Sequence, residues 1–140
     1  MTALSRTKGQ AGEREVAAVL RNLAGWDIRR RVRQHEGDSD VEGIPGWCCE
    51  VKRHARAVRA DLRCWWAQTE RQAVAAGGLR PVLFYRLDRD EWRAMWPVAA
   101  VMAVPDVQTW GGYGMTVEGS IQAWVTVARE CTAALELVGA

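Results

Sequence analysis

Segment 47–52 combines an acid and a base at a spacing that suits phosphate chemistry. It reads as a β-strand, in which successive side chains point to opposite faces. One face is apolar and consists of Trp47, Cys49 and Val51; the other consists of Cys48, Glu50 and Lys52. The strand therefore places a carboxylate and an ammonium group side by side on one surface.

A second carboxylate, Asp40, is expected opposite Glu50. We predict a hairpin of residues 40–43 and 47–53 around a turn at 44–46, which brings the two acids to about 5 Å at Cβ. At an effective dielectric near 20 their repulsion costs roughly 3 kcal/mol. A divalent cation would turn this repulsion into chelation, with the oxygen ligands that magnesium prefers. Relief by Lys52 alone is the simpler alternative.

A third acid, Glu13, lies in a predicted helix over residues 8–24. The apolar residues of this helix recur every three or four positions, at Val16, Ala17, Leu20, Leu23 and Ala24. At 100° per residue Glu13 falls within about 80° of this stripe, whereas Glu15 points to the far side. The helix dipole favours an acid in the first turn but does not explain its inward direction. We therefore expect Glu13 to face the site.

Basic residues gather in the first half of the chain. Residues 1–63 hold 13 Lys and Arg against 9 Asp and Glu, whereas residues 64–140 hold 6 against 8. The two clusters are Arg29, Arg30, Arg31 and Arg33, and Lys52, Arg53, Arg56, Arg59 and Arg63. Such a stripe indicates a polyanion site, although arginine-rich surfaces are also often only solvated.

Composition limits the class of protein. The 140 residues are 49% hydrophobic and 26% charged, which suits one globular domain. No apolar run approaches the ~20 residues of a membrane span, and the first residues do not form a signal segment, so we expect an intracellular, cytoplasmic protein. The cysteines, Cys48, Cys49, Cys64 and Cys131, lack zinc-ligand spacing with His35 or His54 and are expected to be reduced and mostly buried.

The remaining chain predicts one α/β sandwich with a mixed sheet. Residues 26–33 read as a strand and 34–39 as a polar loop. Residues 61–76 read as a helix with Asp61 as N-cap, ended by Gly77-Gly78, and 81–86 and 91–96 as strands. Segment 98–104 fits a helix or a strand, 105–114 a loop, 121–127 a strand and 128–138 a closing helix.

These motifs resemble the archaeal-type Holliday junction resolvases of the PD-(D/E)XK nuclease superfamily. Lys8-Gly9-Gln10-Ala11-Gly12-Glu13-Arg14-Glu15 is similar to their opening Lys-Gly-X3-Glu-Arg-Glu helix. Asp40-Val41 and Glu50-Val51-Lys52 are similar to their strand motifs. The resemblance covers residues 6 to about 97, and implies a restriction-endonuclease-like α/β fold, with a central mixed β-sheet flanked by α-helices.

The resemblance also implies a mechanism. Glu13, Asp40, Glu50 and Lys52 are the expected catalytic residues. Glu13, Asp40, Glu50 and the carbonyl of Val51 would bind Mg²⁺, for which Mn²⁺ can substitute. Lys52 would orient the attacking water, and in-line attack would leave a 5′-phosphate and a 3′-hydroxyl. Gln68 can reach the site in this arrangement, but an exposed polar residue is the simpler interpretation.

The implied partner is DNA, held by Lys8, Arg30, Arg31, Arg33, Arg53 and Arg56. Resolution of four-way junctions in DNA recombination and repair is the main expectation, performed by a homodimer. Residues 1–97 would be the nuclease core. Residues 98–140 would be an extension on the same domain, serving as a dimer interface or as extra cover for the sheet. The alternatives are another restriction-like, repair or phage DNA-processing nuclease acting in the host cytoplasm, and an inactive DNA-binding relative. A protein-interaction domain without nucleic acid is a third alternative, against which the arginine clusters count.

Overall fold

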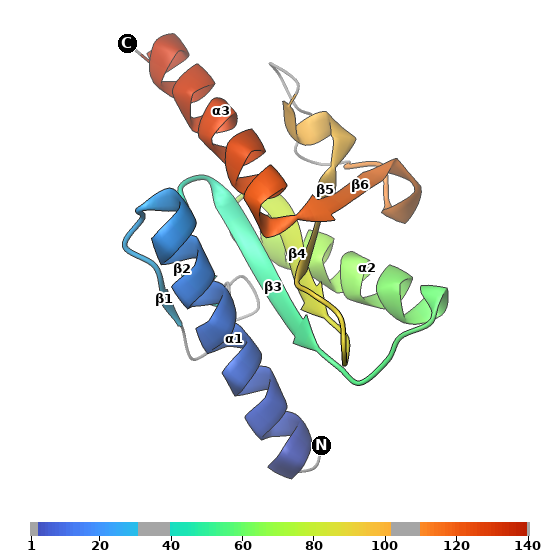
Figure 1. Ribbon diagram of the computed structural model, residues 1–140. Helices are drawn as coiled ribbons and strands as arrows, with labels where there is room; N and C mark the ends of the chain where they lie inside the picture. Colours follow the sequence, from blue (N-terminus) through green and yellow to red (C-terminus); the bar gives the residue numbers. More distant parts are fainter. Residues whose placement is uncertain (1–2, 31–39, 102–109, 140) are drawn as a thin grey trace.

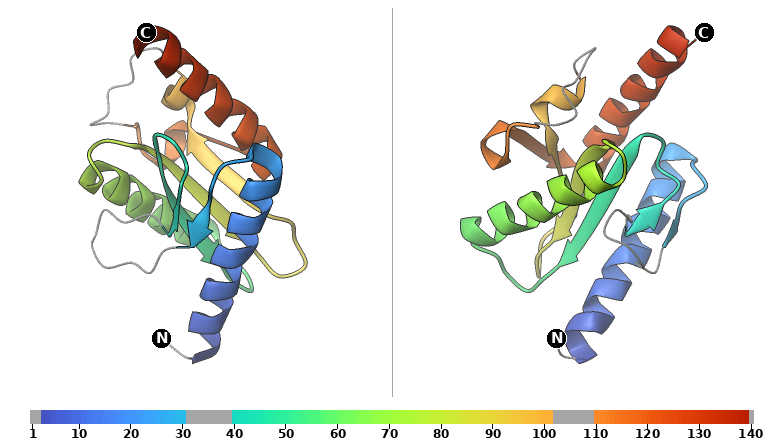
Figure 2. Two further views of the ribbon diagram at one scale, coloured as in Figure 1. Left: turned by 90° about the vertical axis from the view of Figure 1, so that its left-hand side faces the viewer. Right: turned by 180° about the vertical axis from the view of Figure 1, so that it is seen from behind.

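A central β-sheet lies between two helices on one face and one helix on the other (Figure 1). The computed structural model describes residues 3–30, 40–101 and 110–139, with side chains for 8–30, 40–101 and 110–132. Helices α1 (Ala3–Ala24) and α3 (Ile121–Gly139) pack on one face, and α2 (Arg59–Ala75) covers the other, as the side view in Figure 2 shows. The predicted α/β architecture with a mixed sheet flanked by helices is confirmed.

The sheet has the strand order β3-β4-β5-β6. Its strands are β3 (Trp47–Arg53), β4 (Arg80–Arg86), β5 (Arg93–Pro97) and β6 (Thr116–Ser120). β3 and β4 are parallel and are joined through α2, because a parallel pair needs a crossover connection. β5 and β6 add antiparallel strands. β3 is therefore an edge strand of this sheet, with β4 on one side.

The predicted hairpin is wrong, because residues 40–43 and 47–53 do not form a regular antiparallel ladder. β2 (Val41–Glu42) pairs with β1 (Arg29–Arg30) in a separate antiparallel sheet, whereas β3 pairs with β4. Gly43, at φ +103°, permits this: a Cβ there would lie 2.1 Å from the carbonyl oxygen of Asp27. The hairpin prediction weighed only the turn between the strands and missed the close approach of the preceding segment. Of the strand predicted over 26–33, Arg29–Arg30 forms β1, residues 26–28 have no regular secondary structure, and residues 31–33 lie outside the described residues.

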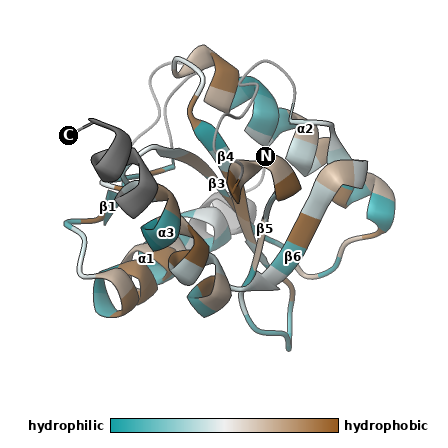
Figure 3. Ribbon diagram, turned by 90° about the horizontal axis from the view of Figure 1, so that it is seen from above, coloured by the Kyte–Doolittle hydropathy of each residue, from teal (hydrophilic) through white to brown (hydrophobic). Residues whose placement is uncertain are grey.

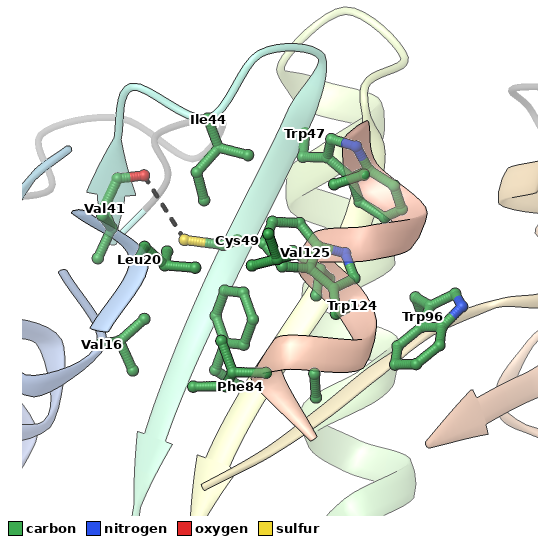
Figure 4. Close-up of a cluster of buried hydrophobic side chains, with 14 of the residues drawn as sticks. Val16, Leu20, Val41, Ile44, Trp47, Cys49, Phe84, Trp96, Trp124 and Val125 are labelled. Carbon is green, nitrogen blue, oxygen red and sulfur yellow. Dashed lines mark hydrogen bonds between the residues drawn. The ribbon is translucent and has the colours of Figure 1, made fainter. Parts of the chain in front are cut away.

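The larger core cluster lies between the sheet and helices α1 and α3 (Figure 4). Val16 and Leu20 of α1 have no exposed surface, as the predicted stripe requires. Trp124 of α3 is also fully buried, with its ring centroid 5.3 Å from that of Trp47 and 5.0 Å from that of Phe84. Edge-to-face aromatic contacts of this kind fix α3 on the sheet.

A smaller cluster joins α2 to the opposite face. It consists of Trp66, Leu83, Tyr85 and Met95. The phenolic hydroxyl of Tyr85 donates to Glu118 of β6, which ties the far edge of the sheet to its centre. Strands β4 and β5 are thus covered on both faces.

The helix ends follow local signals, with one correction. Gly25 takes φ +74° and donates to the carbonyl of Arg21, the predicted glycine stop of α1. α2 ends before Gly77-Gly78, as predicted. Asp61 is not the N-cap: α2 begins after Val58, and the Asp61 carboxylate accepts the Val58 N–H at 2.9 Å from the third helical position.

The C-terminal segment differs most from the sequence predictions. The strand predicted over 121–127 is the beginning of α3, because Ile121, Trp124 and Ala128 form a helical stripe whose burial outweighs the β-branched composition. The Ser120 hydroxyl accepts the Ala123 N–H at 3.0 Å and starts the helix. Val98–Val101 is a short 3₁₀ helix, and β6 was not predicted.

Apolar and polar segments alternate along α1 and α3, which lie side by side in Figure 3. This alternation is what a helix with one buried face requires. Among the described residues, no helix combines the length and apolarity needed to span a membrane.

Candidate active site

Asp40 is bound to the outer edge of β3. Its backbone N–H donates to the carbonyl of Cys49 at 3.1 Å, and its carboxylate accepts the N–H of Val51 at 2.8 Å. The side chain thus accepts the hydrogen bond that a neighbouring strand would otherwise accept. Asp40 lies across from Glu50, the juxtaposition that the sequence predicted, although β2 and β3 do not form the predicted ladder.

Glu50 and Lys52 lie on the face of β3 that α2 covers. Glu50 is 3% exposed, and its Oε1 is 3.1 Å from Nζ of Lys52 and 3.3 Å from Nε2 of Gln68 on α2. Gln68 therefore reaches the candidate site. A buried carboxylate needs such partners, because an unpaired buried charge is costly.

Glu13 faces the small sheet beside Asp40. Its Oε2 accepts from Nε of Arg30 at 2.7 Å, and Arg30 pairs with Val41, the residue after Asp40. Glu15 lies elsewhere: its Oε2 accepts from Arg86 at 3.0 Å and from the Trp92 indole at 2.9 Å. The opposite directions of the two acids agree with the helical angles.

The approach of α1 to β3 depends on Gly12. This residue is buried, and a Cβ at its position would lie 3.0 Å from Cβ of Arg53 and 3.3 Å from the Trp92 ring. These distances are shorter than ordinary van der Waals contacts. The small residue therefore sets how close Glu13, the next residue, comes to the sheet.

The donor atoms at the edge of β3 suit a hard divalent cation. Asp40 and Glu50 are 7% and 3% exposed, and strand alternation directs the Val51 carbonyl to the edge that Asp40 occupies. Magnesium in such sites uses one or two carboxylates and fills its remaining positions with water and phosphate oxygens. Within the described part of the chain, no three Asp, Glu, His or Cys residues gather as a complete ligand set. The residues present fit a cation that completes its coordination with substrate.

Several of the predicted DNA-binding residues form ion pairs. Lys8 and Arg53 lie 3.0 and 2.9 Å from Asp88, and this pair of cations lowers the pKa of its carboxyl. Arg30 binds Glu13, whereas Arg56 is exposed. Arg31 and Arg33 lie outside the described residues.

Two further residues near the site were not predicted from the sequence. The rings of His54 and Trp65 stack with their centroids 4.7 Å apart. The signal was present in the alternation of β3: positions 50, 52 and 54 share one face. The predicted strand ends at Arg53, and the sequence suggests His54 only as a metal ligand.

Cys49 lies between Asp40 and Glu50 in the sequence, and its thiol is chemically inert. Its thiol is buried and donates to the Val41 carbonyl at 3.5 Å. Burial, and then the negative charge of Asp40, raise the pKa of the Cys49 thiol well above its usual range. Cys48, Cys49 and Cys131 are buried and Cys64 is exposed, so the prediction of mostly buried cysteines is confirmed.

The fold is that of a known nuclease structure. The Hjc Holliday junction resolvase of the archaeal hyperthermophile Archaeoglobus fulgidus superposes with a TM-score of 0.50 at 20% sequence identity, over 84% of this chain and 99% of that chain. Identity at this level shows a shared fold. Together with a match to a sequence family, this fold defines the class of protein as the PD-(D/E)XK nucleases.

The sequence match is more specific. Residues 4–110 match the family described as "Phage putative PDDEXK endonuclease", and the chain belongs to this family. PD-(D/E)XK nucleases generally use a divalent metal. No protein with a curated description matches the chain in sequence.

The site geometry predicts selective alkylation of the cysteines. A maleimide added to the folded protein at pH 7 should label Cys64 and leave Cys49 unmodified, as peptide mass spectrometry would measure. Raising the pH to about 9 should not ionise Cys49 in the folded state, whereas the unfolded thiol ionises there. Ionisation thus favours the unfolded state, and stability falls as pH rises through this range.

The control is the protein unfolded in guanidinium chloride, in which all four cysteines should react. Rapid labelling of Cys49 in the folded protein at pH 7 would contradict the burial described here.

Proposed function

We propose that this chain is a divalent-metal-dependent endodeoxyribonuclease that hydrolyses phosphodiester bonds at the edge of β3. The observation that supports this most directly is the burial of two carboxylates along one strand edge. Asp40 accepts the Val51 N–H at 2.8 Å, and Glu50, the residue before Val51, has its carboxylate 3.1 Å from Nζ of Lys52. A purely structural arrangement gains nothing from burying two acids together. An inactive DNA-binding relative would not need this set of residues.

Asp40, Glu50 and the Val51 carbonyl would hold Mg²⁺ or Mn²⁺. The ion, when bound, supplies Lewis-acid polarisation of the scissile phosphate and lowers the pKa of water. Lys52 would orient the attacking water and offset the charge that develops on the phosphate. Gln68 would hold the Glu50 carboxylate in place through its amide. Hydrolysis would leave a 5′-phosphate and a 3′-hydroxyl.

Glu13 would complete the site from the α1 side, as a ligand either directly or through water. Its ion pair with Arg30 keeps the carboxylate beside the strand of Asp40. Arg30 would then bind a phosphate of the substrate when Glu13 turns to the cation.

The DNA backbone would follow the cations that surround the site. Lys8 and Arg53 are held together by Asp88, which is exposed, so phosphate can replace it at little cost. Arg56 extends this surface, and Arg31 and Arg33 remain candidates from the sequence. Phosphate contacts of this kind position DNA without reading its sequence. We expect the enzyme to act on DNA in the cytoplasm.

Removing either central carboxylate should abolish cleavage and keep DNA binding. Asp40→Asn and Glu50→Gln should each lower the single-turnover rate with Mg²⁺ by about 100-fold or more, because the cation loses a charged ligand. Affinity for the same DNA without metal should be equal to or higher than that of the parent, since a negative charge is removed.

The matched control is Asp27→Asn, which neutralises an exposed acid whose ion pair, among the residues that the structure describes, is with Arg29 at 3.4 Å. It should cleave at the parent rate. Near-parent cleavage by either site variant would mean that the metal site lies elsewhere.

Glu13 and Glu15 form a second matched pair. Glu13→Gln should reduce the cleavage rate by about 10-fold or more, because Glu13 faces Arg30 and the strand of Asp40. Glu15→Gln removes the charge of an exposed acid that accepts from Arg86 and from the Trp92 indole, and the amide oxygen of Gln can still accept from both. It should leave the rate within about twofold, with less than about 1 kcal/mol lost in stability. Equal loss of rate in both variants would contradict the assignment of Glu13.

A second, narrower proposal is that branched DNA is the preferred substrate and that two copies of the chain cut opposing strands. The similarity to the opening motif of the junction resolvases and the shared fold with a resolvase over 99% of its length support it. The extension of residues 98–140 would belong to the same domain and provide the dimer contact. Its described part exposes the large apolar side chains Val98, Val101, Met115 and Val117.

Junction selectivity should appear in competition. Two active sites held at a fixed separation can engage strands that diverge from a crossing, so a labelled four-way junction should outcompete linear duplex by more than about 10-fold. Sedimentation should give about twice the 15.6 kDa monomer mass. A monomer that cuts both substrates equally would contradict the junction proposal and leave a general DNA nuclease of the same family.

A further inference from the structure

The end of β3 carries a small aromatic stack that the catalytic proposal does not use. The imidazole of His54 lies against the indole of Trp65 on α2, with centroids 4.7 Å apart and planes at 23°. Behind this pair, the ring of Tyr85 on β4 lies 6.1 Å from that of Trp65 at 53°. The rings form a row that runs from the surface into the core cluster beneath α2.

The stack lies on the same face of β3 as Glu50 and Lys52. The N–H of His54 donates to the Arg86 carbonyl at 3.1 Å, which continues the β3–β4 ladder by one residue and keeps the alternation of side chains. His54 is then about 6.6 Å along the strand from Lys52, at about 3.3 Å per residue. This equals roughly two rises of 3.4 Å per nucleotide along the axis of stacked DNA.

α2 also links the stack to Glu50, the proposed catalytic acid, because it carries both Trp65 and Gln68. Trp65 is one helical turn before Gln68, whose amide lies 3.3 Å from Glu50. The carbonyl of Trp65 accepts the Thr69 hydroxyl at 2.7 Å, within the buried seam of the helix. The indole is therefore held by a rigid element at a fixed place relative to Glu50.

The outer ring of the stack faces solvent in positive surroundings. His54 is exposed and Trp65 is half-buried. Partial burial and the nearby cations Lys52, Lys8 and Arg53 lower the pKa of His54, against an opposing effect of Asp61. The imidazole is thus a neutral aromatic ring at neutral pH, surrounded by groups that attract phosphate. A stack that only closed the corner between β3 and α2 would not leave its outer ring exposed.

We propose that the His54–Trp65 stack binds an unpaired nucleobase of the DNA strand, within about two nucleotides of the scissile phosphate. Every base has an aromatic face, so stacking on such a platform tolerates any sequence. A paired base cannot reach the rings, because its faces are covered by its neighbours in the duplex. This inference rests on the proposed nuclease function and adds the substrate class: DNA with unpaired nucleotides next to the cleaved bond, as at flaps, bulges and branch points.

The test measures binding without metal, so it does not require cleavage. The probe is a flapped duplex with 2-aminopurine at one of the three unpaired nucleotides nearest the branch, alongside the same DNA with an abasic spacer at that nucleotide. At one position the folded protein should quench the 2-aminopurine fluorescence. His54→Ala and Trp65→Leu should bind the base-containing DNA about 5- to 100-fold more weakly than the parent. On the abasic DNA, the variants and the parent should bind equally.

Two further variants separate stacking from folding. Trp65→Phe keeps an aromatic face and should restore most of the affinity that Trp65→Leu loses. Trp26→Phe alters a half-buried indole whose ring packs edge-on against Trp124 in the core beneath α1 and α3, and should bind both DNAs as the parent does. His54 is exposed, so His54→Ala should keep the parent melting temperature.

The outcomes distinguish this proposal from the nuclease proposal. Equal losses on base-containing and abasic DNA, or no loss for His54→Ala with cleavage intact, would overturn the stacking site. Base-dependent losses in a protein that cleaves no DNA with Mg²⁺ or Mn²⁺ would support the stacking site and overturn the proposed nuclease.

Discussion

The site depends on the way Asp40 satisfies the outer edge of β3. Backbone groups that are buried must find partners, and at this edge the Cys49 carbonyl and the Val51 N–H find both in one residue. The Asp40 carboxylate is consequently fixed by main-chain atoms, whose positions the parallel pairing with β4 determines. A carboxylate held by the backbone keeps its place when side chains around it rearrange.

The edge position of β3 also explains how helices on opposite faces of the sheet reach one site. α2 delivers Gln68 to Glu50 on one face. α1 packs on the other face, and its Glu13 binds Arg30 of the small sheet, which pairs with Val41 next to Asp40. A central strand would be flanked by neighbours on both sides and would separate the two helices. The small sheet of β1 and β2 therefore adds to the framework around the site, but its strands do not pair with β3 as a neighbouring strand would.

The sequence predicted those features that repeat with a regular period. The direction of Glu13 followed from the three- and four-residue spacing of Val16 and Leu20, and the shared face of Glu50 and Lys52 from strand alternation. Features set by distant contacts were missed. The helix that begins at Ile121 contains β-branched residues that favour a strand locally, and only its packing on Trp47 and Phe84 decides its structure. β6 is a polar edge strand recognisable only through its pairing with β5.

Gly12 adds a consequence for how this chain can vary. A Cβ at this position would lie 3.0 Å from Cβ of Arg53 and 3.3 Å from the Trp92 ring, so α1 or these side chains would have to move by a few tenths of an ångström to accept a methyl group. A substitution there would tilt the first turns of α1 away from β3 and carry the neighbouring carboxylate with them. In a library randomised at positions 12 and 13, the two positions would be constrained for unrelated reasons, one by volume and the other by charge. Selection for folding alone would then recover glycine at position 12 but would not retain the acid at position 13.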